Sequence, residues 1–358
     1  MRETSPVNAT TPAADLASFK PKRREAHGRA DLLVGQNVPK HDQAAQQRGP
    51  TIPSRDASLP LPAGEGRGEG ESIASPPFKT RRKASATARR LIVNADDFGR
   101  SHSINQAVIR AHREGILTTA SLMVNGDAFD EAVELAKQNP TLGVGLHLTL
   151  ICGKATCGRM EIPDLVNTLG EFSSSPVAAG TRYYFSSGLR LQLAREIGAQ
   201  FAKFKATGLT LDHFNGHLNM HLHPTVLRIL LSRHLEWGIR HFRVTDDPFS
   251  LNRKLARGHW FYRASHALIF NRLSRRAREH LVRGGIRFTD HVFGLLQNSR
   301  VDEAFVTRLL PALPRGDSEL YSHPSLDEFR HEFDALVSPR VKRQVTEQGI
   351  QLIRYQDL

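Results

Sequence analysis

The chain has 358 residues, of which 39% are hydrophobic and 24% are charged, and its formal net charge is +13. It contains no run of eighteen apolar residues, which excludes a membrane-spanning helix of ordinary length. Two cysteines, Cys152 and Cys157, are too few for a disulfide framework or a four-thiolate zinc site, so we expect reduced thiols in a cytoplasmic protein.

Residues 1–88 differ in composition from the rest of the chain. They contain ten of the nineteen prolines and two aromatic side chains, Phe19 and Phe78. Such a segment buries too little apolar surface to offset chain entropy, so we expect a disordered, low-complexity tail. Residues 1–90 hold 16 basic and 9 acidic side chains, so about half of the net charge belongs to this tail. Nucleic-acid binding is therefore not expected of the remainder.

Residues 89–358 alternate between strand-like and helix-like patterns and are enough for one large α/β domain. Short apolar runs predict parallel strands at 91–93, 118–124, 142–148, 209–214, 239–244, 286–288, 318–322 and 351–353. Apolar spacings of three and four predict helices at 103–115, 128–136, 189–206, 224–236, 251–282, 301–310 and 326–336. Residues 149–188 show no period and are predicted to form a long loop or lid.

This alternation predicts a (β/α) TIM-barrel-like parallel barrel, either seven-stranded or incomplete. A doubly wound open sheet is the alternative, although no glycine-rich phosphate loop follows the first strand. In a parallel barrel the carboxyl ends of the strands meet at one rim, where catalytic groups gather. The acidic and imidazole side chains at or just after the ends of predicted strands are Asp96, Asp97, His147, His213, His217 and His323.

These residue types suit hydrolysis assisted by a metal ion. One carboxylate and two imidazoles commonly hold a divalent cation and leave positions open for water and substrate. A second carboxylate would accept a proton, and a histidine would return one to the leaving group. Each residue alone has a structural alternative, since aspartates cap helices and histidines are often satisfied within a core. The segment 211–224, with four histidines, favours the functional interpretation because unpartnered buried imidazoles would cost stability.

The same segments resemble the YdjC-like carbohydrate deacetylases. The resemblance covers about residues 89–355 and is greatest to the hopanoid biosynthesis-associated branch, HpnK. The motifs that carry it are, in chain order, 94–99 (NADDFG), 115–125 (GILTTASLMVN), 144–149 (VGLHLT), the histidine segment before Pro224, 290–295 (DHVFGL) and 322–324 (SHP).

The resemblance implies a barrel enzyme that removes an N-acetyl group from an amino sugar, a hydrolase acting on a linear amide C–N bond. It implies Asp97, His147 and His217 as ligands of one divalent metal ion. Asp96 corresponds to the general base and His323 to the group that assists protonation of the leaving amine. Magnesium is the metal implied by the family, whereas two imidazoles and a carboxylate suit zinc or another transition ion at least as well.

Two positions depart from the family pattern. The usual His-x-His-x-His segment here has Asn219 at its centre, and an amide cannot shuttle a proton. Arg243 is followed by Val-Thr-Asp where the family tends toward Arg-x-Pro. Arg243 and His221 are the predicted substrate-binding side chains.

The branch implies the N-acetylglucosaminyl group of a hopanoid glycolipid as substrate. A chitooligosaccharide deacetylase of sugar catabolism is the alternative, and a metal phosphoesterase is a third reading. Residues 253–287 contain ten Lys or Arg and one acid, Glu279. They predict either a surface helix packed on the barrel or a peripheral contact with anionic lipid at the inner membrane. The sequence leaves the oligomeric state open, a homo-oligomer included.

Overall fold

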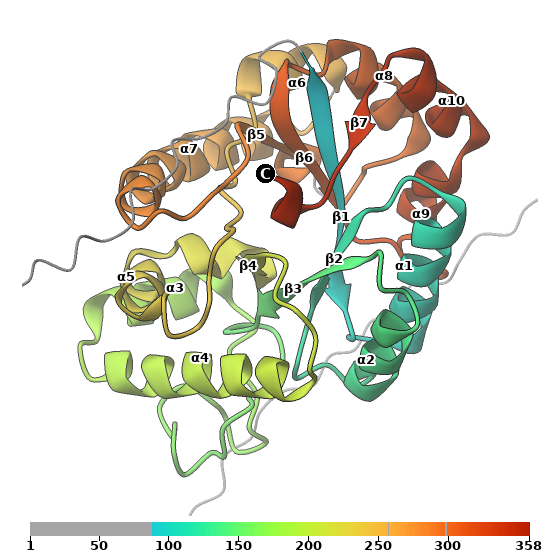
Figure 1. The fold of residues 1–358 in the computed structure, drawn as a ribbon. Coiled ribbons are helices and arrows are strands. Elements are labelled where there is room, and N and C mark those ends of the chain that lie inside the picture. The colour runs from blue at the N-terminus through green and yellow to red at the C-terminus, as the bar shows by residue number, and fades with distance from the viewer. Residues whose placement is uncertain (1–87, 257, 298) are drawn as a thin grey trace, which may run out of the picture. The chain divides into compact units, whose positions relative to one another are not determined.

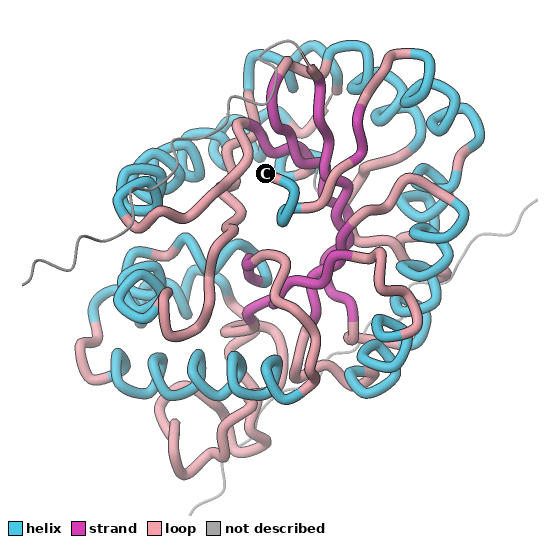
Figure 2. Tube along the Cα trace, in the orientation of Figure 1, coloured by secondary structure: helices cyan, strands magenta, loops and turns pink. Residues whose placement is uncertain are grey.

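The structure is a computed structural model and describes residues 88–256, 258–297 and 299–358. Apart from residue 88, the tail predicted to be disordered lies outside the described residues. The described part is a parallel sheet surrounded by helices (Figures 1 and 2). Within these ranges, no helix combines the length and the apolar content needed to span a membrane.

The sheet is formed by strands that all pair in parallel. Its order is β4-β3-β2-β1-β6-β5, and β7 pairs with the beginning of β1. The order places the carboxyl ends of β1 and β3, which carry the predicted metal ligands, two strands apart. The strands are β1 (Arg89–Phe98), β2 (Thr119–Leu122), β3 (Gly143–Leu148), β4 (Phe214–Gly216), β5 (His291–Phe293), β6 (Gly316–Ser322) and β7 (Gln351–Leu352).

Two isolated parallel bridges extend the sheet beyond its edge strands. Phe214 of β4 pairs with Phe242, and His241 pairs with Arg287, which precedes β5. Through these bridges the sheet curls into a barrel with incomplete walls, which confirms the predicted parallel barrel in its incomplete form. Strands were predicted at 239–244 and 286–288, but these segments pair only through the isolated bridges at His241, Phe242 and Arg287.

Ten α-helices lie in the described part of the chain, and Figure 1 shows them around the sheet. Their bounds agree most closely with the predicted ones at α4, which coincides with 189–206. They are α1 (His102–Glu114), α2 (Phe129–Lys137), α3 (Pro176–Phe185), α4 (Leu189–Ala206), α5 (Pro224–Arg233), α6 (Phe249–Leu255), α7 (Trp260–Arg283), α8 (Glu303–Ala312), α9 (Arg330–Val337) and α10 (Pro339–Glu347).

Three helical predictions were wrong in detail, each for a local reason. The stretch 251–282 is two helices, because His259 takes a left-handed φ of +49° between α6 and α7. The predicted loop 149–188 contains α3, whose first turn is capped by the Ser175 hydroxyl ahead of Pro176. The chain also forms α10, where Ser338 accepts hydrogen bonds from two amides of the first turn.

The two faces of the sheet differ in polarity. Successive residues of a strand point to opposite faces, and in β1 the outward residues Leu91, Val93 and Ala95 join the main hydrophobic core under the helices. The inward residues become polar toward the carboxyl end of the strand, at Asn94 and Asp96, and both are buried. The interior of the barrel is therefore a polar compartment at the end where the predicted site lies.

Two glycines of β3 leave space for side chains of the neighbouring chain segment. A Cβ atom on Gly145 would lie 2.6 Å from the imidazole of His213, and one on Gly143 would lie 2.8 Å from Cγ of Asp212. Together with His147, these positions lie on the inward face of β3, since they alternate along the strand. Residues 143–147 (GVGLH) thus combine one predicted ligand with the room that two buried partners need.

Candidate metal centre and active site

The Asp96–Asp97 pair lies on an irregularity of β1. Ala95 pairs with Ala120 and Phe98 with Leu122, so one extra residue is inserted in β1 between these pairs. Asp97 takes a left-handed φ of +63°, which is uncommon for a residue other than glycine. A bulge of this kind re-aims side chains beside functional sites. It explains how two adjacent carboxylates both reach the imidazole of His147 inside the barrel.

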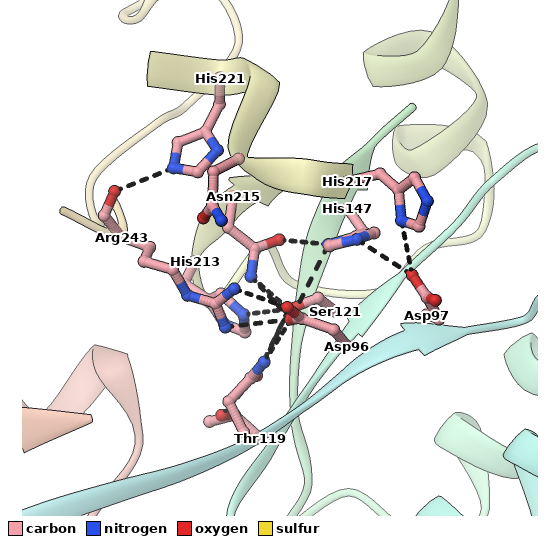
Figure 3. Close-up of polar contacts among 12 residues, drawn as sticks. Asp96, Asp97, Thr119, Ser121, His147, His213, Asn215, His217, His221 and Arg243 are labelled. Carbon is pink, nitrogen blue, oxygen red and sulfur yellow. Dashed lines mark hydrogen bonds and ion pairs between the residues drawn. The ribbon is translucent and has the colours of Figure 1, made fainter. Parts of the chain in front are cut away.

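Asp97, His147 and His217 form the group predicted to hold a metal ion. Each offers a ligand atom, and these atoms all lie within 4.8 Å of one another. Oδ1 of Asp97 lies 3.2 Å from Nε2 of His147 and 2.9 Å from Nδ1 of His217 (Figure 3). Burial opposes the charge of Asp97, but the two histidines outweigh it and hold the pKa of its carboxyl well below the usual value. The carboxylate is therefore ionised and able to bind a cation.

The protonation of His147 fits a metal ligand. Its Nδ1 lies 2.7 Å from Oδ1 of Asn215, an acceptor, so this nitrogen carries the proton. Its buried Nε2 has no hydrogen-bond partner among the described residues, although it faces Asp97. A neutral imidazole whose other nitrogen donates to an oxygen presents a lone pair, as metal-bound histidines do. The donor set accordingly fits a divalent metal ion.

Asp96 is buried inside the barrel, and both of its carboxylate oxygens accept hydrogen bonds. Both guanidinium NH2 groups of Arg243 donate to its carboxylate, at 2.7 and 3.0 Å. The side-chain amides of Asn94 and Asn215 donate to its Oδ1, at 2.8 and 3.1 Å. Burial alone would raise the pKa of Asp96, but Arg243 and His147 outweigh it and lower the pKa far below the usual value. Asp96 is therefore ionised at neutral pH.

The two residues predicted to bind substrate are both inaccessible in this structure. Arg243 is 0% exposed, is held by Asp96 and Glu319, and has its guanidinium carbon 4.3 Å from the centre of the Tyr321 ring. His221 is also 0% exposed, and its Nε2 lies 3.1 Å from the Arg243 carbonyl oxygen. Burial, with the charge of Arg243, lowers the pKa of His221 to about 3, so its ring is neutral. The contact of Arg243 and His221 with substrate stays a prediction. In this structure Arg243 forms an ion pair with Asp96.

His323 follows β6 at the same rim. Ser322 pairs with Ala95, so His323 comes next to Asp96 across the two strands. Its Nδ1 lies 3.8 Å from Oε2 of Glu332 on α9, and 26% of its side chain is exposed. Burial lowers the pKa of His323, but Glu332, with Asp97 and Asp96 farther away, outweighs burial and raises the pKa to about 9. His323 is thus protonated at neutral pH and able to donate a proton.

The contact with Glu332 gives a testable pH dependence. A step that needs protonated His323 is complete below its pKa and is lost as the pH rises through about 9. Glu332→Gln removes the largest of the contributions that raise this pKa, so the alkaline limb of the rate–pH profile should move to lower pH. The Glu328→Gln variant, which alters an exposed acid ahead of α9, should leave the limb in place. An alkaline limb unchanged in Glu332→Gln would contradict the role of His323.

Several buried residues of the site were missed by the sequence reasoning. His213 was proposed as a rim residue, but it bonds Asp212 and Ser121 and does not join the metal group. The missed residues are hydrogen-bond partners rather than reactive groups. Four of them are polar residues on strands, whereas Glu332 lies on α9. They are Asn94, Ser121, Asn215, Glu319 and Glu332.

Comparison with known proteins agrees with these motifs. A carbohydrate deacetylase of Brevibacillus brevis is 41% identical over 150 residues, which cover 42% of this chain and 57% of the relative. A carbohydrate deacetylase of Geobacillus stearothermophilus is 40% identical over 143 residues, which cover 40% of this chain and 54% of the relative. The chain thus matches little more than half the length of these curated relatives.

A solved structure with the same fold comes from Enterococcus faecalis V583, and its name proposes cellobiose-phosphate cleavage. It has a TM-score of 0.59 and 23% identity, and the match covers 76% of this chain and 99% of that one. At this identity the likeness concerns the fold, and it agrees with the incomplete parallel barrel. The sequence profile of the YdjC-like proteins matches residues 90–347, which extend from β1 to α10. The chain therefore belongs to the YdjC-like protein family.

Proposed function

We propose that this chain is a metal-dependent hydrolase that removes the acetyl group from an N-acetylated amino sugar. The observation that carries the proposal is the convergence of Asp97, His147 and His217 beside a second carboxylate and a protonated imidazole. The relatives that match the chain are named carbohydrate deacetylases, which supports the same reaction. Two-metal phosphoesterases need further bridging carboxylates, so the phosphoesterase alternative is disfavoured.

Each residue of the site has a separate role in the proposed reaction. In hydrolysis the water oxygen bonds to the acetyl carbon, the C–N bond breaks, and the nitrogen leaves as an amine. A divalent cation held by Asp97, His147 and His217 would polarise the acetyl carbonyl and acidify water. Asp96 is ionised and accepts the water proton, while His323 donates a proton to the departing nitrogen. The acetate and the free amine are the two products.

The imidazole-rich donor set favours zinc or another transition ion over magnesium, the metal implied by the family. Reconstitution of metal-stripped protein with each ion in parallel will decide between them. Greater acetate release with magnesium than with zinc, cobalt or manganese would contradict this preference.

Release of acetate tests the proposed reaction directly. Metal-loaded protein is incubated with N,N′-diacetylchitobiose, with an N-acetylglucosaminyl hopanoid and with a phosphate monoester, and acetate and phosphate are measured. Acetate release that a chelator abolishes would support the proposal. Phosphate release without any acetate would replace it with the phosphoesterase alternative.

For the substrate, we propose the lipid-linked amino sugar, and α7 supplies the support. Its first half exposes Trp260, Phe261, Leu268 and Ile269, with Phe261 89% exposed. Its second half exposes arginines at 272, 275, 276 and 283. Apolar side chains beside a row of basic ones suit an anionic lipid surface. The helix also packs against the 3-10 turn that carries His217, η1 (His217–Leu222), so a lipid contact would bring the metal centre close to the membrane.

Co-sedimentation with vesicles checks the lipid contact. Binding to phosphatidylglycerol vesicles should exceed binding to phosphatidylcholine vesicles and should weaken at high salt. Phe261→Glu with Leu268→Glu should abolish it, whereas Leu235→Glu, at an 84% exposed position after α5, should not. Turnover of chitobiose but not of the hopanoid, without vesicle binding, would assign the chain to sugar catabolism.

A further inference from the structure

A chain of buried hydrogen bonds runs through the barrel interior to the metal ligand His147. Asp212 Oδ2 lies 2.9 Å from Nδ1 of His213, and Nε2 of His213 lies 2.9 Å from the Ser121 hydroxyl. The amide nitrogen of Asn215 donates to the same hydroxyl oxygen at 2.8 Å. Oδ1 of Asn215 then contacts His147. We call Asp212, His213, Ser121 and Asn215 the buried polar chain; each is at most 2% exposed.

The position of each proton in the buried polar chain follows from the donors and acceptors that its residues contact. Burial opposes the charge of Asp212, but hydrogen bonds from His213 and from the Gln356 amide outweigh it and lower its pKa, so Asp212 accepts. The Ser121 oxygen accepts from the side-chain amides of Asn215 and Asn94, at 2.8 and 3.1 Å, so its own hydroxyl proton is directed to Nε2 of His213. His213 therefore carries its proton on Nδ1, toward Asp212.

These constraints fix the side-chain amide of Asn215. Its nitrogen has two acceptors, the Ser121 oxygen at 2.8 Å and Asp96 Oδ1 at 3.1 Å. A flipped amide would point its oxygen at both of them, and it would offer an N–H to Nδ1 of His147. His147 would then carry its proton on Nε2, the nitrogen that faces Asp97, and could not bind a metal ion there. The amide orientation therefore selects the form of His147 that can act as a ligand.

Further contacts hold the buried polar chain in one position. The ring of Tyr355, near the carboxyl end of the protein, stacks on His213 with centroids 4.6 Å apart. Gly145 leaves room for the same imidazole, since a Cβ atom there would lie 2.6 Å from the ring. His213 is thus enclosed between β3 and the C-terminal turn η3 (Tyr355–Asp357), is 1% exposed and is not a member of the metal group.

We propose that Ser121 and His213 are positioning residues that fix the Asn215 amide and through it the orientation and tautomer of His147. The proposal rests on the metal-binding part of the proposed function. It assigns these buried residues to metal affinity rather than to the hydrolytic step itself. Loss of an outer hydrogen-bond partner of a metal-binding histidine commonly weakens metal binding by about 10–100-fold.

The test compares Ser121→Ala with Ser274→Ala. Both serines are 0% exposed, and the Ser274 hydroxyl donates to the Thr245 carbonyl at 3.0 Å, so the second variant loses a buried hydrogen bond elsewhere. Both should lose similar stability in urea. Only Ser121→Ala should bind Co²⁺ about 10–100-fold more weakly and alter the visible absorption spectrum of the bound Co²⁺. Equal affinities and identical spectra for the two variants would overturn the proposal.

A second measurement needs no variant. In metal-free wild-type protein, nitrogen NMR of the histidine side chains should find a proton on Nδ1 of His147. An Nδ1 without a proton would overturn the proposal, and so would a wild-type protein that binds no Co²⁺. A protein that passes both metal tests but releases no acetate would overturn the proposed function and leave the positioning role of Ser121 and His213 supported.

Discussion

Replacing Asp97 with asparagine is expected to abolish tight metal binding and, with it, acetate release. Oδ1 of Asp97 lies within 3.2 Å of a nitrogen of each of the two histidine ligands, so it is the charge around which the group is arranged. Asparagine has nearly the same shape but carries no charge. A metal ion supplies several kcal/mol of transition-state stabilisation, so kcat/KM should fall by on the order of 10³. Calorimetric titration with Zn²⁺ or Co²⁺ and an acetate assay measure the two losses.

The matched control for this change is Asp127→Asn. Asp127 is an aspartate whose side chain is 76% exposed and which pairs with Lys154 at the surface. Exposed pairs of this kind contribute at most about 1 kcal/mol to stability, and neither metal binding nor activity should change. Wild-type metal affinity in Asp97→Asn would show that the ion, if bound, is held elsewhere.

The fold and the convergence of Asp97, His147 and His217 could be predicted because they depend on local signals. Alternating runs of apolar residues mark the strands. Asp97 and His147 lie near the carboxyl ends of β1 and β3, and His217 directly follows β4. Parallel strands bring such positions to one rim whatever the details of the loops. The structure brings these three residues together as a single group.

The residues that contact and orient the site side chains could not be predicted, because these contacts join positions far apart in sequence. The bulge at Asp97 is visible only as a shift in pairing between β1 and β2. Glu332 reaches His323 from α9, and Glu319 reaches Arg243 from β6. Asn219, which replaces the usual central histidine, takes a left-handed φ of +57° and accepts a hydrogen bond from Thr245. The left-handed backbone explains why asparagine occupies this position, since asparagine tolerates that conformation better than most residues.

Arg243 lies in an environment that the sequence did not indicate. It was predicted to bind substrate, which stays a prediction. Its side chain is directed inward, where it donates to Asp96 and Glu319 at 2.6–3.0 Å. The Tyr355 hydroxyl donates to the other oxygen of Glu319, so the C-terminal turn η3 also contacts this buried ion-pair network. A hydropathy pattern cannot reveal this, because a buried ion pair and an exposed arginine look alike in sequence.

Replacing Arg243 with methionine should therefore cost stability as well as activity. The change leaves Asp96 and Glu319 buried without their cation, and removal of one partner of a buried ion pair typically costs about 3–5 kcal/mol. Urea unfolding followed by circular dichroism measures this loss. The matched control is Arg233→Met, which removes an arginine paired with Glu236 at the surface and should cost less than about 1 kcal/mol. A loss below about 1 kcal/mol for Arg243→Met would contradict the buried network.

The kinetics of Arg243→Lys separate the two roles that have been considered for this residue. Lysine keeps the charge and should fold, but it cannot donate to Asp96 through two parallel N–H groups. If Arg243 positions the carboxylate that accepts the water proton, kcat should fall while KM stays near the wild-type value, because an interaction of the transition state is lost. If Arg243 contacts the sugar, KM should rise with kcat unchanged. The complete burial of the guanidinium and its four short contacts with carboxylates favour the first outcome.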